Sequence, residues 1–336
     1  MISLYWNFRV RLAWGLVLLA VVAFAVMAPG FLSVSNVHAL VQSFAALGVL
    51  AVGLSLTMIA GEFDLSIAGV VPLTALITIA VGQSTSLVVG VVLGLLVALA
   101  FGLLNGWLTA RFSIPALAVT VGTMVLTTGL GHAVAGGEVV TLTDFGIGLS
   151  LDAPVAGILS IHSIVELGLV VAAVFVMART WTGLTIYSVG SDPARSAASG
   201  LSVSRAMVTV FVASALFAGV AGALQGISLA AATPGADLDT VLQAATAVIV
   251  GGVALSGGKG KVLGAIAGAA LLSVVGNGLS LIGTPTAVVQ LANAAILLVV
   301  VVTDGTLTRL VRRGAENAAT TLVPAPAATT PQGGSS

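Results

Sequence analysis

Long apolar stretches separated by short polar segments dominate this chain of 336 residues. A helix needs about 20 mainly apolar residues to cross a bilayer, because its backbone groups must be hydrogen-bonded without water. Ten stretches meet or approach this length. We expect them at residues 12–31, 37–60, 65–82, 86–110, 115–135, 161–178, 206–229, 241–256, 262–282 and 286–303. The pattern predicts an all-α integral membrane protein with about ten transmembrane helices.

The basic residues support this arrangement, because Lys and Arg in short loops are retained on the cytoplasmic side. All 11 lie before the first expected span, after the fourth, between the sixth and seventh, between the eighth and ninth, or after the tenth. The opposite loops have acidic residues and no basic ones: Glu138, Asp144, Asp152, Asp237 and Asp239. Both termini are therefore predicted to be cytoplasmic.

The expected spans divide the chain into a cytoplasmic segment at 1–11, a polytopic domain at 12–304 and a cytoplasmic tail at 305–336. The tail is rich in Ala, Pro, Thr, Gly and Ser, so it is expected to be largely disordered. A signal peptide is the alternative interpretation of the first apolar stretch, because Arg9 and Arg11 precede it. That stretch is longer than a signal core, and its removal would disrupt the alternation of loop charge.

Composition excludes several classes of protein. Hydrophobic residues make up 58% of the chain and charged residues only 7%, whereas soluble domains carry about 25% charged residues. The chain has no cysteine, which excludes disulfides and thiolate metal sites. Its net charge is zero and its basic residues are scattered, so nucleic acid is not an expected partner. Membrane lipid is.

Small and polar residues within the spans indicate how the helices pack. Three glycine pairs are spaced four apart, which favours close helix contacts: Gly90 and Gly94, Gly222 and Gly226, Gly264 and Gly268. Uncharged polar side chains also occur there: Gln42, Asn105, Gln225, Gln243, Asn277, Gln290 and Asn293. Interhelical hydrogen bonding is the simpler interpretation of each one. As a set they suit an uncharged, hydroxyl-rich solute.

Ionisable residues within the spans are scarce, and we single out His132 and Glu166. A carrier driven by protons or sodium usually keeps carboxylates or a proton relay in the membrane. The scarcity indicates that transport energy comes from elsewhere. For these two residues, a wet helix end or a structural hydrogen bond is the simpler interpretation. An ion-coupled carrier that requires Glu166 remains an alternative.

A pair of carboxylates precedes the third span, in the segment Gly61-Glu62-Phe63-Asp64-Leu65-Ser66. Asp64 is expected to be the N-cap of the following helix, where its carboxylate would accept free amides. Catalysis by this pair is disfavoured, because no His, nucleophile or metal-ligand set accompanies it.

Segment 61–66 resembles a signature of the permeases of ribose-, xylose- and arabinose-type ABC importers, in the same superfamily as branched-chain amino acid permeases. Further matches lie at 102–106, 114–115, 120–124, 183–200 and 250–260. The resemblance extends from about residue 40 to residue 304. It implies that one set of residues lies near the translocation path: Gly61, Glu62, Asp64, Ser66, Asn105, Thr120, Gly122, Thr123 and Asn277.

The resemblance also implies that a cytoplasmic segment at about 180–205 docks on an ATPase subunit. The matching residues are Gly183, Tyr187, Gly190, Asp192, Pro193, Ala197 and Gly200. Independently, Asp192 and Pro193 are typical of the first two positions of a short helix that Gly200 could close. An ordinary structured loop is the alternative.

The glycine-rich run at 250–260 is not a phosphate loop. A Walker motif would need Gly at position 253 and a hydroxyl at position 260, where this chain has Val253 and Gly260. No other such motif occurs in the sequence. The chain is therefore expected to bind no cofactor or metal and to have no catalytic residue, with ATP and Mg²⁺ held by a partner subunit.

The expected function is that of the permease subunit of an ABC importer, most simply for a monosaccharide, in a bacterial inner membrane. The resemblance implies an ATPase partner, often fused in tandem. It also implies a periplasmic or lipid-anchored sugar-binding protein and a second permease copy or paralogue. Alternatives are a permease for branched-chain amino acids, nucleosides or another polar signal molecule, and a membrane-embedded enzyme or scaffold. The last class would need a catalytic constellation that the sequence does not provide.

Overall fold

A computed structural model describes residues 2–300 and 302 of the chain, and most of these residues are helical. The longer helices are α1 (Ile2–Met27), α2 (Val34–Ile59), α3 (Ile67–Ser84), α4 (Leu87–Phe112), α5 (Ala116–Ala135), α7 (Ile161–Arg179), α10 (Val203–Leu229) and α12 (Val262–Leu281). The shorter ones are α6 (Gly146–Asp152), α8 (Trp181–Ser191), α9 (Pro193–Ala198), α11 (Leu238–Val250) and an apolar helix at Thr286–Val300. The predicted all-α membrane fold is confirmed.

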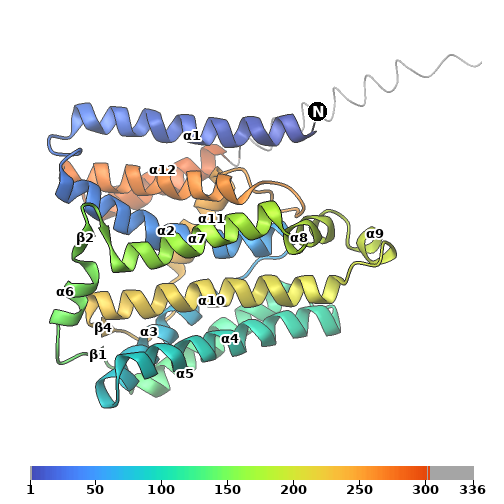
Figure 1. Cartoon of the computed structure of the whole chain (residues 1–336), viewed down its shortest axis with the longest axis horizontal. Helices are drawn as coiled ribbons and strands as arrows, with labels where there is room; N and C mark the ends of the chain where they lie inside the picture. The colour runs from blue at the N-terminus through green and yellow to red at the C-terminus, as the bar shows by residue number, and fades with distance from the viewer. Residues whose placement is uncertain (1, 301, 303–336) are drawn as a thin grey trace, which may run out of the picture.

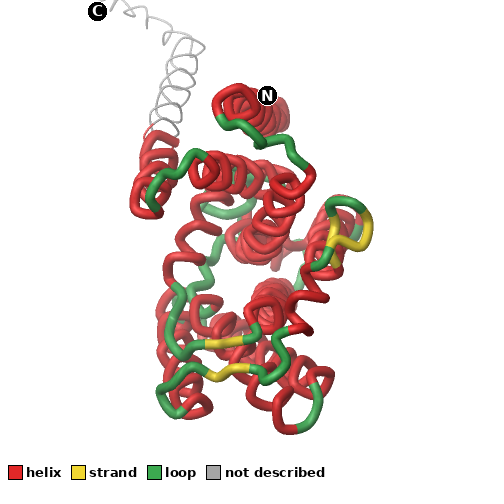
Figure 2. Tube along the Cα trace, turned by 90° about the vertical axis from the view of Figure 1, so that its left-hand side faces the viewer, coloured by secondary structure: helices red, strands yellow, loops and turns green. Residues whose placement is uncertain are grey.

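Two small antiparallel strand pairs complete the fold. β1 (Val140–Thr141) pairs with β4 (Ala231–Ala232), and β2 (Pro154–Ala156) pairs with β3 (Leu159–Ser160). Figure 1 shows the long helices side by side, with the strands and α6 at one end of the bundle and α8 and α9 at the other. Figure 2 views the molecule from the strand end. With the predicted sidedness, the strand end is external and the α8–α9 end is cytoplasmic.

Among the described residues, eight helices are long and apolar enough to cross a membrane. They match eight of the ten expected spans. The other two expectations, 241–256 and 286–303, fall on the shorter helices Leu238–Val250 and Thr286–Val300. The cytoplasmic placement of both termini stays a prediction, and the predicted disordered tail at 305–336 lies outside the described residues.

The predicted glycine pairs lie at close helix contacts. A Cβ added at Gly222 of α10 would lie 2.2 Å from the Val71 carbonyl oxygen of α3. One added at Gly268 of α12 would lie 1.9 Å from the Ala247 carbonyl oxygen of α11. Lipid tails are as apolar as hydrophobic side chains, so the hydrophobic effect does not drive helices together within a membrane. Helices associate instead where small residues allow their backbones to pack closely. The prediction of packing seams is confirmed.

Helix α3 is too short to run the full depth of its neighbour α4. It has 18 residues and α4 has 26, a difference of about 12 Å at the helical rise. The two helices are antiparallel and joined by a short turn, so α3 begins well inside the bundle. Residues 60–66 return from the end of α2 to this interior starting point.

Helix α11 also begins inside the bundle, and Pro72 explains its position. Proline has no amide hydrogen, so Pro72 leaves the carbonyl of Ala68 without its partner within α3. The Asp237 amide donates to that carbonyl oxygen at 2.8 Å. The Asp237 side chain accepts from the Thr240 amide at 3.1 Å and so caps α11. Asp237, expected in an outer loop, therefore lies where the N-termini of α3 and the shorter helix α11 come close together.

We expect Gly268→Leu to destabilise the chain strongly, because the new side chain would collide with the α11 backbone. Overpacking of a buried contact typically costs about 1–3 kcal/mol, and a backbone collision lies at the upper end. The measurement is the thermal unfolding midpoint of the purified protein in detergent. Gly15→Leu is the matched control, because nothing lies within 4 Å of a Cβ at Gly15. Equal midpoints for the two variants would contradict the close packing of α11 and α12.

Candidate functional site

Segment 61–66 is held in the interior by a chain of polar contacts. The Asp64 side chain is fully buried, and its Oδ1 accepts from the Ser66 amide at 2.9 Å and from the Ser66 hydroxyl at 2.5 Å. The Asn105 amide of α4 donates to the same hydroxyl oxygen at 2.9 Å. These contacts join the start of α3 to α4.

The prediction that Asp64 is the N-cap of α3 is wrong by two positions. Ser66 occupies the cap position, and its side chain makes no capping hydrogen bond. Aspartate readily accepts from the amide two residues further along, which forms a local turn. This turn lies ahead of the helix. The carboxylate thus orders the entry into α3 and does not bond its first helical amides.

The other side of segment 61–66 is held by α5. The Thr120 hydroxyl donates to the Phe63 carbonyl oxygen at 3.3 Å. Burial raises the pKa of the Glu62 carboxyl, and a backbone hydrogen bond with Ala116 opposes that rise. The Thr123 hydroxyl donates to carbonyls of its own helix, while Gly122 faces open space. The structure therefore brings Glu62, Asp64, Ser66, Asn105 and Thr120 into one region, with Thr123 and Gly122 one turn further along α5.

Asn277 lies elsewhere. It exchanges two amide hydrogen bonds with Asn36, at 2.9 and 3.1 Å, and so joins α12 to the opposite end of α2. Here the simpler interpretation, interhelical hydrogen bonding, accounts for the side chain.

The predicted docking segment consists of two helices. Asp192 is the N-cap of α9, its carboxylate accepts from the Arg195 amide at 3.0 Å, and Pro193 occupies the first turn. Gly200 follows the helix with a φ of +81°. The short capped helix predicted from these residues is confirmed, with Ala197 in its last turn. The preceding residues, Gly183 to Gly190, lie within α8 and do not form a loop.

Four glycines join this segment to the rest of the protein, and we call Gly61, Gly190, Gly257 and Gly258 the glycine junction. A Cβ at Gly190 would lie 1.9 Å from the Ile59 carbonyl oxygen, and one at Gly257 would lie 2.6 Å from the Gly61 Cα. The Gly258 amide donates to the Ile59 carbonyl oxygen at 2.7 Å. The junction explains the glycine-rich run at 250–260, which packs against α8 and the end of α2.

Two further residues of α8 are packed against neighbours. Burial raises the pKa of the Tyr187 phenol to about 12, although a backbone hydrogen bond with Val262 opposes the shift. A Cβ at Gly183 would lie 2.4 Å from the Met177 carbonyl oxygen of α7. Helix α8 is thus fixed against α7, α12 and the glycine junction, and α9 projects beyond it with Ala197 exposed.

A polar cluster that lies at the strand end was not predicted from the sequence. We call it the outer cluster, and it consists of Gln42, Asp152, His162, Glu166 and Ser228. Asp152 Oδ1 lies 2.8 Å from His162 Nδ1 and accepts from the Gln42 amide at 3.1 Å. The Ser228 hydroxyl donates to Asp152 Oδ2. Glu166, which is buried, lies 3.4 Å from His162 Nε2. The cluster joins α2, α6, α7 and α10.

His38 lies beside the outer cluster and contacts two backbone oxygens. Its Nδ1 is 2.9 Å from the Ile158 carbonyl oxygen and its Nε2 is 3.0 Å from the Asp152 carbonyl oxygen. His38 and His162 both fall within expected spans, where an ionisable residue is rare. Their positions alone could therefore have marked them as candidate functional residues. By contrast, His132 is exposed in the last turn of α5, as predicted for a wet helix end.

Within the described part of the chain, no group of three or more His, Asp or Glu side chains could hold a metal ion. The geometry is therefore that of a helix bundle with an interior polar segment, a glycine junction at one end and an ionisable cluster at the other.

Comparison with known protein families identifies one matching family. The model of the branched-chain amino acid transport system / permease component family matches residues 36–301. This match includes segment 61–66, the docking segment and the glycine junction. The chain belongs to this family. The permease is accordingly a multi-pass protein of the cell's inner membrane.

The permease is similar to several curated proteins along most of its length. It is 30% identical over 299 residues to the ribose import permease protein RbsC of Escherichia coli (strain K12), with 86% of this chain and 91% of that protein covered. The L-arabinose ABC transporter permease protein AraH of Azospirillum brasilense is 30% identical over 301 residues, with 86% of each chain covered. The xylose/arabinose import permease protein XylH of Sulfolobus acidocaldarius is 30% identical over 262 residues, covering 75% of this chain and 72% of that protein. No solved structure matches the chain.

We expect His162→Leu to destabilise the permease, because Asp152 and Glu166 would lose the ring between them. Removing one partner of a buried ion pair costs about 3 kcal/mol or more. The thermal unfolding midpoint in detergent measures this loss.

A double variant, His162→Leu with Glu166→Leu, tests the cause of that loss. Replacing both buried partners by apolar residues is often nearly neutral, so the double variant should regain much of the midpoint. A double variant less stable than His162→Leu alone would show that the pairing is not the reason.

Proposed function

We propose that this chain is the membrane-spanning subunit of an ATP-binding cassette importer that moves a monosaccharide into the cell. The observation that carries the proposal is similarity to the ribose, arabinose and xylose permeases, at 30% identity over at least three quarters of the chain. The family description names branched-chain amino acids, so a branched-chain amino acid is the competing substrate.

The chain's own residues support an uncharged substrate. Within the described helices, polar side chains that face the interior are mainly amides and hydroxyls, such as Asn105 and Thr120. The buried carboxylates are engaged locally, Asp64 by Ser66 and Glu166 by His162. A bundle of this kind offers hydrogen bonds to sugar hydroxyls and no proton relay across the membrane.

Energy would enter through the α8–α9 segment. The sequence has no Walker motif, so ATP and Mg²⁺ would be bound by a partner ATPase that docks on this segment. Displacement of α8 would press on the glycine junction and thereby on the end of α2 and on segment 61–66. ATP turnover could then bias two arrangements of the bundle, which is the requirement for alternating access.

The remaining partners follow from the same proposal. A sugar-binding protein would dock at the strand end, and a second copy or paralogue of the permease would pair with this one. The chain itself would perform no covalent chemistry, and the residues of its family motifs would act by positioning helices.

The experiment that tests the proposal is uptake of radiolabelled ribose, arabinose, xylose and leucine into vesicles. The vesicles carry the permease with its ATPase and binding protein, with and without internal ATP. ATP-dependent uptake of a sugar supports the proposal. Uptake of leucine alone would assign the competing substrate, and uptake without ATP that collapses with the ion gradients would indicate an ion-coupled carrier.

We expect Arg195→Glu to weaken the association with the ATPase about tenfold or more, because it reverses a charge on the projecting helix α9. The Arg195 side chain is 89% exposed and pairs with Asp192 at 3.2 Å, so the fold should be unaffected. Co-purification of the ATPase and ATP-dependent uptake are the two measurements. Glu138→Lys is the matched control, a charge reversal at an exposed position at the strand end. Equal loss in both variants would contradict docking on α9.

A further inference from the structure

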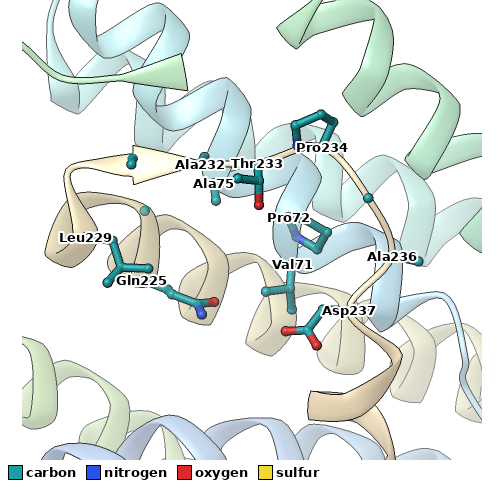
Figure 3. A pocket seen from close by; sticks show the side chains of 13 residues that line it. Val71, Pro72, Ala75, Gln225, Leu229, Ala232, Thr233, Pro234, Ala236 and Asp237 are labelled. Carbon is teal, nitrogen blue, oxygen red and sulfur yellow. The ribbon is translucent and has the colours of Figure 1, made fainter. Parts of the chain in front are cut away.

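A cavity of about 350 Å³ lies between α3, α10 and the segment that leads into α11. Figure 3 shows it from close by. Its walls come from Val71, Pro72 and Ala75 of α3, from the last turns of α10 and from residues 231–237. The volume falls within the range of small-molecule sites, about 300–1,000 Å³.

Three polar side chains from different parts of the fold meet at this cavity. The Gln225 carboxamide extends from α10 toward Val71, and the Thr233 hydroxyl points into the same space from the segment above it (Figure 3). The Asp237 carboxylate lies at the inner end, beside Val71. Together they provide hydrogen-bond donors and acceptors on opposite walls.

Gln225 and Thr233 are exposed where they line the cavity, and neither has a hydrogen-bonding partner among the described residues. An amide in a membrane helix usually bonds another helix or faces a wet path. Asn277 illustrates the first case, because it is paired with Asn36. Gln225 illustrates the second, because its carboxamide is directed into the cavity.

The charge of the lining distinguishes between substrate classes. The lining includes one carboxylate, Asp237, and no Lys, Arg or His. The carboxylate of an amino acid would have no cationic partner here and would face Asp237. A neutral polyol can donate hydroxyl hydrogens to Asp237 and exchange hydrogen bonds with Gln225 and Thr233. The rings of Pro72 and Pro234 offer apolar surface to the carbon skeleton of a sugar.

The cavity also lies close to the N-termini of α3 and α11. The hydrogen bond from Asp237 to Ala68 joins its floor to the first turn of α3. Discontinuous helices that meet inside a membrane are a recurring way to build a transport site, because their ends leave polar groups available. Any change in the spacing of α3 and α11 would alter the cavity.

We propose that this cavity binds the neutral sugar during its passage, with Gln225 and Thr233 as specificity-determining hydrogen-bonding residues and Asp237 as an acceptor at its inner end. This inference rests on the proposed function, since it assigns a substrate site to an importer.

The test is sugar uptake by the complete importer in vesicles, with Gln225→Leu and Thr233→Val examined separately. Each substitution keeps a similar size and removes hydrogen bonding. We expect each to lower ATP-dependent ribose uptake about three- to tenfold, while ATP hydrolysis stimulated by the binding protein stays near that of the unmodified complex. Gln83→Leu is the matched control, because Gln83 lies on the outer end of α3 and bonds only the Thr143 amide.

The outcomes separate this inference from the proposed function. If the unmodified importer moves ribose and neither variant changes its uptake, the cavity is not a sugar site and the proposed function still stands. If the unmodified importer moves leucine and no sugar, the proposed function fails and this inference fails with it.

A second measurement does not depend on transport rates. The chain has no cysteine, so Thr233→Cys introduces a single thiol. In the assembled importer with its binding protein, we expect a water-soluble thiol reagent to modify this position, and saturating ribose to slow the modification several-fold. Thr143→Cys, at the strand end, should react without protection by ribose. No modification at position 233, or equal rates with and without ribose, would overturn the inference.

Discussion

The hydrogen bond between the Asp237 amide and the Ala68 carbonyl determines the architecture of the interior. Pro72 frees that carbonyl, and in a membrane a freed backbone group must find a protein partner. The partner comes from the entry to α11, so α3 and α11 begin beside each other. Asp237 also lines the cavity, and segment 61–66 leads into the same end of α3. One missing amide hydrogen thus organises both features.

Much of the fold could be predicted because lipid imposes simple rules. Apolar length identified the long helices, and the spacing of small residues identified contacts such as Gly222 on Val71. The capped helix α9 was predictable from Asp192 and Pro193, because capping depends on neighbouring residues. The same rules could not distinguish a full span from α11 and its irregular continuation. That difference depends on Asp237 reaching α3, a contact between residues 169 positions apart in the sequence, which only the folded chain brings together.

The site was less predictable for related reasons. The family motif identified Asp64. The local sequence allows its carboxylate either to cap α3 or to accept from the Ser66 amide, and the structure shows the second arrangement. Asn105 and Thr120 lie beside this segment because α4 and α5 fold against it, whereas Asn277 finds Asn36 at the other end of α2. The outer cluster joins four helices whose contributing residues lie far apart in the sequence. The roles of His162 and the neighbouring His38 could be assigned only once the folded chain had brought Asp152 and the Ile158 carbonyl beside them.

The glycine junction has a mechanical property that follows from its lack of side chains. The backbones at Gly190 and Ile59 are already in contact, so α8 cannot move toward α2 without displacing it. Movement apart is opposed chiefly by one hydrogen bond at Ile59 and the weaker contact of Ser191 with Gly258. The glycine junction therefore resists movement of α8 toward α2 more strongly than movement of α8 away from it. A push on α8 would therefore be passed directly to the end of α2, whereas a pull of equal force would open the contact first.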